Sequence, residues 1–481
     1  MDSSRRRWGT LAGVALASFM TFLDNNVVNV ALPSIQRDLG LTISGLEWIV
    51  SSYILVFSGL MLVGGRLADV YGRRRIFLTG LVVFTGASLL AGLATSPAML
   101  VGSRVLQGIG AALTMPATLA IISATFPDER ERGRAVGIWS AVGALALALG
   151  PFTGGFISER WDWGWIFLIN VPVGIVTIGI IATSMRESRD AAPRRLDVPG
   201  LVTSAIALFA VTYALIEGHN QGWTSPLILG SFALSALATA AFLVIESRTA
   251  DPMVDLSMFR KRVFSGGVGA MILWGFGVMG IYFFTAMYLQ NVLRFSPTEA
   301  GAAFVPMALL MAMTAPVADP IARRLGTHRT VAIGLTLNVI GMILVSFVGE
   351  NGRFADLMPA FVLFGIGSGL VMMPLTSAII GVLPANRAAA ASAVLNTARE
   401  VSGLLGVTIV GAILTTRQSA AARGGADPLH AFLDGYQFAL VVAAAIVFVG
   451  APVAWFTLRS RTARAAVAEQ PAGTPALEPV A

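Results

Sequence analysis

The chain is dominated by long apolar segments. Fourteen stretches of about 20 residues or more follow one another through nearly all of its 481 residues. About 20 such residues let an α-helix cross a bilayer, and a helix satisfies its own backbone hydrogen bonds in lipid. The sequence therefore predicts an all-α integral membrane protein with 14 transmembrane helices. We expect them near residues 10–32, 46–65, 76–95, 98–125, 134–157, 165–184, 198–217, 226–246, 264–290, 298–320, 329–349, 356–383, 389–415 and 434–458.

Composition excludes several other classes of protein. Only 12% of the residues are charged, against about 25% in soluble domains. The net charge of +7 comes from basic residues spread over short links, which fits membrane topology better than a nucleic-acid surface. The chain has no cysteine, and its three histidines (His219, His328 and His430) lie far apart, so we expect no metal site. It has neither a phosphate-binding glycine loop with lysine nor a catalytic triad, so we expect no cofactor and no enzyme activity.

The basic residues predict the orientation in the membrane. Alternate links, starting with the N-terminus, hold 26 of the 33 basic residues, and the opposite links hold 6. Because cytoplasmic links are enriched in Lys and Arg, both chain ends should be cytoplasmic (N-in, C-in). Only one basic residue is lysine, which indicates a GC-rich bacterial genome. We therefore expect a multi-pass protein of a bacterial plasma membrane.

Charged links divide the helices into groups of six, two and six. The longest charged link of the first part follows the sixth helix, and a second basic cluster precedes the ninth. The predicted divisions are a cytoplasmic N-terminus (1–9), a six-helix half (10–184), a cytoplasmic linker (185–197), two extra helices (198–246), a second six-helix half (247–459) and a disordered cytoplasmic tail (460–481).

The link between the second and third helices has a distinctive pattern, G-x-L-A-D-x-x-G-R-R. It runs from Gly65 to Arg75, and Asp69 stands four residues before Arg73, which predicts a local ion pair. One interpretation is a basic loop that only sets topology. The pattern also resembles the signature loop of the major facilitator superfamily. That resemblance implies a cytoplasmic gate that latches the two halves, built on Gly65, Asp69, Gly72, Arg73 and Arg74.

A degenerate copy of this loop occupies residues 316–329. Asp319 stands four residues before Arg323, as Asp69 stands before Arg73. Aligning Gly326 with Gly72 instead places Arg323 in the position of Asp69. Both registers remain open from the sequence.

Three further motifs resemble the fourteen-helix drug/proton antiporters of the same superfamily. The first helix carries L-D-x-x-V-V-N-V-A-L-P from Leu23, and the fourth carries R-x-x-Q-G-x-G from Arg104. In that family the arginine is tied to proton transfer. The fifth helix carries G-P-x-x-G-G, a signature of exporters, which implies a moving seam at Gly150, Pro151, Gly154 and Gly155.

Acids within the apolar segments are candidates for proton coupling. An ionised, unpaired carboxylate is costly in the bilayer, so Asp24 should face a water-filled path or hold a proton. The alternative is a packing role with neighbouring asparagines as hydrogen-bond partners. Arg104 cannot be neutralised and needs a carboxylate, a carbonyl or water, so a structural ion pair is the alternative for it. Asp319 and Glu400 are further acids at or near membrane depth.

The substrate cavity is predicted to include Asn25, Asn29, Tyr53, Trp274 and Tyr282. Aromatic rings in such a cavity can hold flat cations through cation–π contacts. Packing against neighbouring helices is the alternative for each aromatic residue.

These features predict a proton-coupled secondary exporter that works by alternating access. Its partners would be small, amphipathic or cationic organic compounds and the lipid bilayer. The proton gradient would be its energy source, and the protein would be a monomer. Two alternatives remain: a dedicated exporter of one natural product for self-resistance, and a non-transporting membrane receptor or scaffold.

Overall fold

The computed structural model describes residues 3–189, 197–249, 252–383 and 388–459. The described helices follow one another along the chain. They are α1 (Ser3–Leu39), α2 (Ile43–Tyr71), α3 (Arg73–Gly92), α4 (Pro97–Thr114), α5 (Ala117–Thr125), α6 (Glu129–Arg160), α7 (Trp165–Leu168), α8 (Asn170–Ser184), α9 (Val198–Gln221), α10 (Pro226–Arg248), η1 (Leu256–Arg260), α11 (Arg262–Asn291), α12 (Pro297–Leu325), α13 (Thr327–Ser346), α14 (Phe354–Gly381), α15 (Ala388–Arg423), α16 (Pro428–Phe448) and α17 (Gly450–Thr457).

The described residues form fourteen helical spans that are long and apolar enough to cross a membrane, as predicted. Three spans combine two consecutive helices: α4 with α5, α7 with α8, and α16 with α17. Several helices are longer than predicted; α1, for example, continues through Pro33 to Leu39. The predicted lengths correspond to the thickness of the hydrocarbon core, and the helices are longer because they continue into the interfacial regions.

Local sequence signals set many helix ends. Ser296 begins α12 with a capping box, in which its hydroxyl accepts from the Glu299 backbone and the Glu299 carboxylate accepts from the Ser296 backbone. Asp128 caps α6 in the same way that Ser96 caps α4, each side chain accepting a backbone N–H three residues later. Such caps let these spans end in short links.

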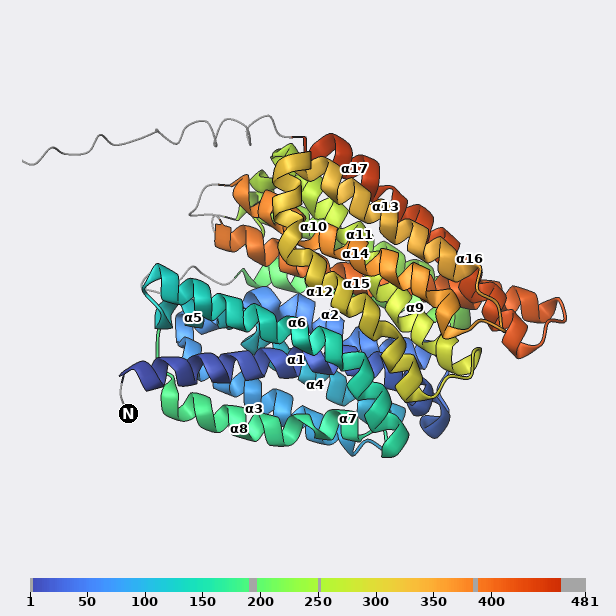
Figure 1. The fold of residues 1–481 in the computed structure, drawn as a ribbon, viewed down its shortest axis with the longest axis horizontal. Helices are drawn as coiled ribbons and strands as arrows, with labels where there is room; N and C mark the ends of the chain where they lie inside the picture. The colour runs from blue at the N-terminus through green and yellow to red at the C-terminus, as the bar shows by residue number, and fades with distance from the viewer. Residues whose placement is uncertain (1–2, 190–196, 250–251, 384–387, 460–481) are drawn as a thin grey trace, which may run out of the picture.

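The spans form two bundles (Figure 1). We call α1–α8 the N-terminal bundle and α11–α17 the C-terminal bundle. The two bundles meet along α6 and α12, and again along α2 and α15. Residues 185–189 are described and 190–196 are not, and the predicted disordered tail 460–481 lies outside the described residues.

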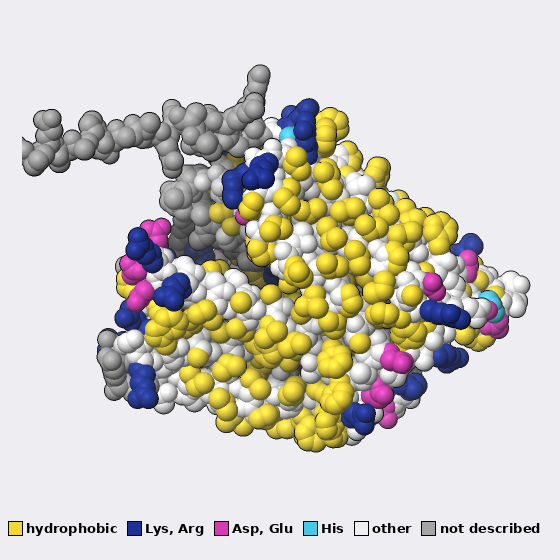
Figure 2. All heavy atoms as spheres, viewed as in Figure 1, with side chains coloured by type: hydrophobic (Ala, Val, Ile, Leu, Met, Phe, Trp, Pro, Cys, Tyr) yellow, Lys and Arg dark blue, Asp and Glu magenta, His cyan; other side chains and the backbone are white. Residues whose placement is uncertain are grey.

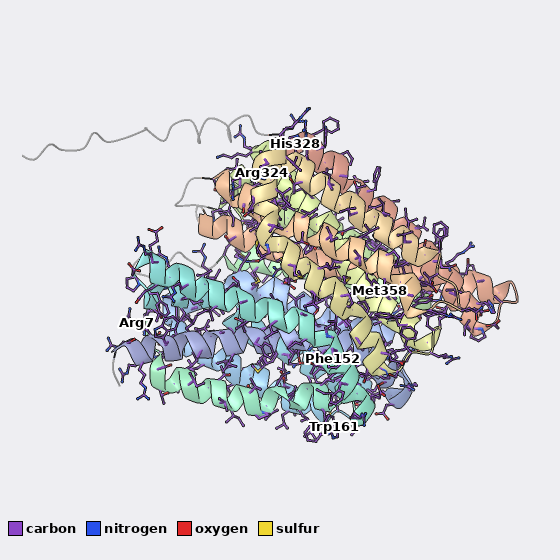
Figure 3. The ribbon with its side chains drawn as sticks, in the orientation of Figure 1. Arg7, Phe152, Trp161, Arg324, His328 and Met358 are labelled. Carbon is purple, nitrogen blue, oxygen red and sulfur yellow. The ribbon has the colours of Figure 1, made fainter. Side chains whose placement is uncertain are left out.

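The lipid-facing surface is apolar in the middle and charged at its ends. Figure 2 shows hydrophobic side chains over the centre of one face, with basic and acidic groups towards the two ends. Arg7, Arg324 and His328 lie at one end, and Trp161 lies towards the other (Figure 3). The first end carries the arginine-rich links, so we call it the cytoplasmic end and the opposite one the outer end.

The two extra helices differ in their environment. α9 lies against both α2 and α15, and therefore against both bundles. Its Phe209 and Tyr213 pack on Trp48 of α2, with ring centroids 6.3 Å apart in both pairs. α10 packs on α9, where the Ser235 hydroxyl donates to the Ala207 carbonyl (2.8 Å), and presents much of its remaining surface to lipid.

Contacts close the boundary between the bundles at the outer end. The Gln290 side-chain amide of α11 donates to the Val30 carbonyl of α1 (2.7 Å). The Thr298 backbone N–H of α12 donates to the Glu159 carboxylate of α6 (3.0 Å). Since both bonds join opposite bundles, the structure is closed towards the outside.

Candidate functional site

Asp24 and Arg104 form an ion pair inside the N-terminal bundle. Arg104 Nη1 lies 2.5 Å from Asp24 Oδ2, and the two side chains are 1% and 0% exposed. Asp24 comes from the middle of α1 and Arg104 from α4. The glycine-rich pattern after Arg104 lets neighbouring helices approach: Gly108 packs on the Tyr53 carbonyl of α2 and Gly110 on the α3 backbone. The carboxylate is thus paired and not exposed to an open water path.

Polar side chains of α3, α4 and α8 form a hydrogen-bond network around the ion pair. Gln107 and Asn170 each donate to Asp24 Oδ1 at 3.0 Å. Ser88 on α3 accepts from the same two amides, at 2.7 Å from Gln107 and 3.4 Å from Asn170. The ionised form of Asp24 therefore has three donors, which offsets the cost of burying its charge.

The Arg104 guanidinium is held on all sides. Its Nε donates to the Ile49 carbonyl (3.2 Å), and Nη1 also donates to Gln107 Oε1 (2.9 Å). The Tyr53 ring lies 4.2 Å from the guanidinium carbon, which is a cation–π contact. Arg104 is thus an ion-paired residue at the centre of a polar network, and its role in proton transfer stays a prediction.

The asparagines near Asp24 in sequence do not bind it. Asn26 donates to the Phe22 carbonyl (2.7 Å) and Asn29 to the Asn25 carbonyl (3.4 Å), both within α1. The suggestion that these neighbours are the hydrogen-bond partners of Asp24 is therefore wrong. Residues on a helix one, two or five positions away face other directions, and the partners come from α4 and α8 instead.

The two other predicted acids lie outside this network. Asp319 on α12 accepts from the Ser377 hydroxyl of α14 (3.0 Å). Glu400 on α15 forms an ion pair with its neighbour Arg399 (3.2 Å), which the sequence interpretation did not require. Glu400 is nevertheless close enough to Tyr53 to interact with it electrostatically, as Asp24 and Arg104 also are. An acid of the C-terminal bundle therefore lies within electrostatic range of a tyrosine that also contacts Arg104.

The predicted cavity residues have different surroundings. Asn25 is half-buried, and Asn29 is buried. Tyr53 and Trp274 are buried, and the Tyr53 hydroxyl and Trp274 indole N–H have no hydrogen-bond partner among the described residues. Tyr282 stacks on Phe304, with ring centroids 4.3 Å apart, and so belongs to an aromatic cluster of the C-terminal bundle.

The charged loop after α2 is ordered by contacts within the N-terminal bundle. The predicted ion pair is confirmed, with Arg73 Nη2 2.9 Å from Asp69 Oδ1. Glu187, after α8, accepts from the backbone N–H groups of Arg74 (2.9 Å) and Arg75 (3.3 Å), which places a carboxylate at the N-terminus of α3. Gly72 has φ of +109°, and an added Cβ would lie 2.6 Å from the Glu187 carboxylate. Glycine is thus required there for two independent reasons.

The remaining arginine and glycine of the loop have separate contacts. The Arg74 guanidinium donates to the Ala182 carbonyl of α8 (2.7 Å). Gly65 packs against Pro116, between α4 and α5, where an added Cβ would lie 3.4 Å from the proline ring. The loop therefore links α2, α3 and α8 at the cytoplasmic end.

The structure favours one register for the degenerate copy of this loop. Gly326 separates α12 from α13 with φ of +93°, as Gly72 separates α2 from α3 with φ of +109°. Gly326 therefore corresponds to Gly72, and Arg323 takes the place of Asp69. Asp319 is not the counterpart of the acid in the first loop.

The glycine–proline seam of α6 lies where α6 meets α1 and α12. An added Cβ at Gly150 would lie 2.6 Å from Asn26 Cβ, and one at Gly154 would lie 2.5 Å from the Val27 carbonyl oxygen, both on α1. Gly155 faces the Pro297 carbonyl of α12, and the Pro151 carbonyl faces Gly301 of α12. Backbone therefore touches backbone across the boundary between the bundles.

The model of the Major Facilitator Superfamily matches residues 14–407. The chain belongs to this superfamily. Its relatives include the puromycin resistance protein pur8 of Streptomyces alboniger, 36% identical over 482 residues, which cover 98% of this chain and 95% of that protein. The tetracenomycin C resistance and export protein of Streptomyces glaucescens is 32% identical and covers 97% of this chain and 94% of its own length. The multidrug resistance protein Stp of Mycobacterium tuberculosis is 34% identical, and the match covers 85% of this chain and 76% of that protein.

Solved structures of superfamily transporters share the fold. A bacterial homologue of the human lysosomal transporter Spinster, in an inward-facing and unoccupied conformation, superposes with a TM-score of 0.70 at 17% identity. The match covers 94% of this chain and 97% of that one. The protein is therefore a transporter and not an enzyme, and its helical spans and bacterial relatives make it a multi-pass protein of the plasma membrane.

Sequence reasoning missed part of the buried network. The predicted site residues do not include Asn170, Gln107 or Ser88. Each is a polar side chain in the middle of an apolar span, which is a signal for a functional or hydrogen-bonded position. Gln107 and Asn170 meet at one carboxylate and Ser88 accepts from both amides, which depends on how helices pack and is not contained in any spacing of the sequence.

Proposed function

We propose that this superfamily member exports small amphipathic organic compounds in exchange for protons. The observation that carries the proposal is the fully buried Asp24–Arg104 pair in the middle of the N-terminal bundle. The names of its relatives describe antibiotic resistance and export, and the exporter signature of α6 lies at the boundary that must move. The proton gradient supplies the energy for export, and no cofactor is needed. The protein transports as a monomer.

Competition for one carboxylate supports the coupling. Asp24 in its ionised form binds the Arg104 guanidinium. A proton added to Asp24 removes the charge that the guanidinium binds, so protonation and the ion pair exclude each other. The same competition applies to a cationic substrate that interacts with Asp24 or with Glu400. Proton and substrate can then move in opposite directions in one cycle.

Unsatisfied polar groups support a substrate site between the bundles. The Tyr53 hydroxyl of α2, the Trp274 indole of α11 and the Thr397 hydroxyl of α15 are buried without a hydrogen-bond partner among the described residues. Buried polar groups are normally hydrogen-bonded, so such atoms are available to a ligand. Asn25 and Asn29 lie on the adjoining part of α1, and the Tyr282 ring adds apolar surface.

Dependence on the proton gradient is the first test of this function. Cells that lack their own pumps and express the protein should extrude puromycin or ethidium, and an uncoupler should stop that efflux while ATP is still present. Efflux that survives the uncoupler and stops on ATP depletion would contradict the proposal. Cells with an empty vector control for passive leakage.

The loop after α2 should act as a gate, and Asp69→Asn tests it. The substitution removes the ion pair with Arg73 but keeps the shape of the side chain. The pair is partly exposed, so folding should change by only about 0.2–1 kcal/mol. We expect the transport rate to fall severalfold while substrate binding in detergent is unchanged. The reason is that the loop lies at the cytoplasmic end, whereas Asp24 lies in the middle of α1. Lost binding with a normal transport rate would contradict the gate.

A further inference from the structure

A second buried carboxyl lies near the outer end of the boundary between the bundles. Glu47, in the second turn of α2, is 2% exposed, and its Oε1 has no hydrogen-bond partner among the described residues. It precedes Ile49, whose carbonyl binds Arg104, by two residues, or about 200° around the helix. Its side chain therefore points away from the Asp24–Arg104 pair and forms a separate site.

Helices from both bundles enclose this carboxyl. Glu47 Oε1 occupies the position that a Cβ on Gly411 of α15 would take, with Phe284 of α11 beside it. Only glycine at position 411 leaves room for the carboxyl. The group is therefore buried by contact between α2 of one bundle and α15 and α11 of the other, and that contact exists only while the outer end is closed.

The charged groups around Glu47 do not neutralise it. Glu217 of α9 interacts with it as a like charge, and that carboxylate accepts from the Trp48 indole (2.9 Å) and the Asn220 amide (3.2 Å). His219 of α9 is bonded to the Ser419 hydroxyl of α15 (2.9 Å). Arg417 of α15 is engaged by Asp434 (2.8 Å). No cation is bonded to Glu47 among the described residues, so an ionised Glu47 would be a buried anion beside a second anion.

We propose that Glu47 is a second proton-binding site, loaded from the outside, which must be protonated before the outer end can close. The inference rests on the proposed proton exchange and gives it an entry point. With the outer end open, the carboxylate is solvated and ionised. A proton from the external water then forms an O–H bond with it, and the neutral acid is buried when α15 meets α2. Closure thus takes up one proton from outside.

This proposal predicts that the opening of the outer end depends on pH and that this dependence requires Glu47. The chain has no cysteine, so two introduced cysteines can be spin-labelled without altering any other residue. Arg37→Cys, at the outer end of α1, and Ala420→Cys, at the outer end of α15, are both exposed. The distance between the labels is measured by double electron–electron resonance in lipid nanodiscs from pH 5 to 9. We expect a shift to longer distances as the pH rises.

Variants of the two acids separate the possible outcomes. Glu47→Gln mimics the protonated acid, and the short distance should persist at every pH. Glu217→Gln removes the neighbouring negative charge, which makes an ionised Glu47 less unfavourable in the closed state, so the short distance should persist to higher pH. An unchanged pH response in Glu47→Gln would overturn the proposal, as would opening at lower pH in Glu217→Gln. Elution as a single monodisperse peak controls for folding.

The same samples distinguish this inference from the proposed function. If the unsubstituted protein exports puromycin with proton exchange but Glu47→Gln keeps its pH response, only the inference fails. If the unsubstituted protein shows no proton exchange during export, the proposed function fails, whatever the labels report.

Discussion

Replacing Asp24 by Asn should reduce proton-coupled export to the background of cells without the protein. The amide keeps the size of the side chain but cannot take up and release a proton. In the structure it would also leave the Arg104 guanidinium, 1% exposed, without its anionic partner. Susceptibility to puromycin in cells lacking their own pumps, with the amount of protein measured by blotting, checks this result.

The Asp24–Arg104 ion pair determines how Asp24→Asn should affect the stability of the protein. A neutral amide is cheaper to bury than a carboxylate, which by itself would leave folding intact. The structure predicts a loss of about 3–5 kcal/mol, because breaking a buried pair leaves one charge uncompensated. The double variant Asp24→Asn/Arg104→Gln removes both charges and should regain much of that stability without regaining export.

The double variant therefore separates folding from coupling. Thermal unfolding in detergent reports stability, and uptake into proteoliposomes reports transport. If the double variant regains stability and transport together, the pair serves the fold and the proton is carried elsewhere. Asp319 or Glu400 would then be the next candidate.

Gly155→Val should also have a large effect, by a different route. Position 155 faces the Pro297 carbonyl across the boundary between the bundles, and a side chain there must push the two backbones apart. Overpacking of this kind costs about 1–3 kcal/mol, which displaces a two-state equilibrium by about five- to 150-fold. We expect the outer end to stay open and export to fall by a similar factor, while puromycin still binds in detergent.

A matched control lies on the same helix. Gly137 is exposed on α6, and an added Cβ there would meet nothing within 4 Å. Gly137→Val should therefore export normally. The distance between spin labels at positions 37 and 420 should lengthen in Gly155→Val and not in Gly137→Val. Equal behaviour of the two variants would show that the seam does not control closure.

The sequence was sufficient for the number and kind of the helices, but not for their ends. Fourteen apolar segments are visible because each must match one bilayer thickness. Bilayer thickness does not set where α1 ends, since beyond the hydrocarbon core a helix can continue in polar sequence; α1 ends at Leu39, before Gly40 with φ of +63°. The pair Asp69–Arg73 was also predicted from its four-residue spacing, and it forms although Gly72 separates α2 from α3 between the two residues.

Long-range partners were not predictable in the same way. Asn170 is 146 residues from Asp24, and Glu159 binds the backbone at Thr298, 139 residues away. Such contacts depend on the packing of helices from different parts of the chain. The burial of Glu47 likewise depends on Gly411 of the other bundle. The register of the second loop required the positive φ of Gly326, a backbone property that the degenerate sequence does not contain.

Proton movement during transport tests the central claim most directly. Proteoliposomes with an acidic lumen and a trapped pH dye receive puromycin, or the compound with the largest effect in the susceptibility test, and its uptake is followed together with lumenal pH. We predict that the compound enters and the lumen becomes alkaline faster with the unsubstituted protein, and that Asp24→Asn/Arg104→Gln and protein-free vesicles show neither effect. Uptake without a change in lumenal pH, or equal proton movement in the double variant, would contradict the proposal that Asp24 and Arg104 couple export to protons.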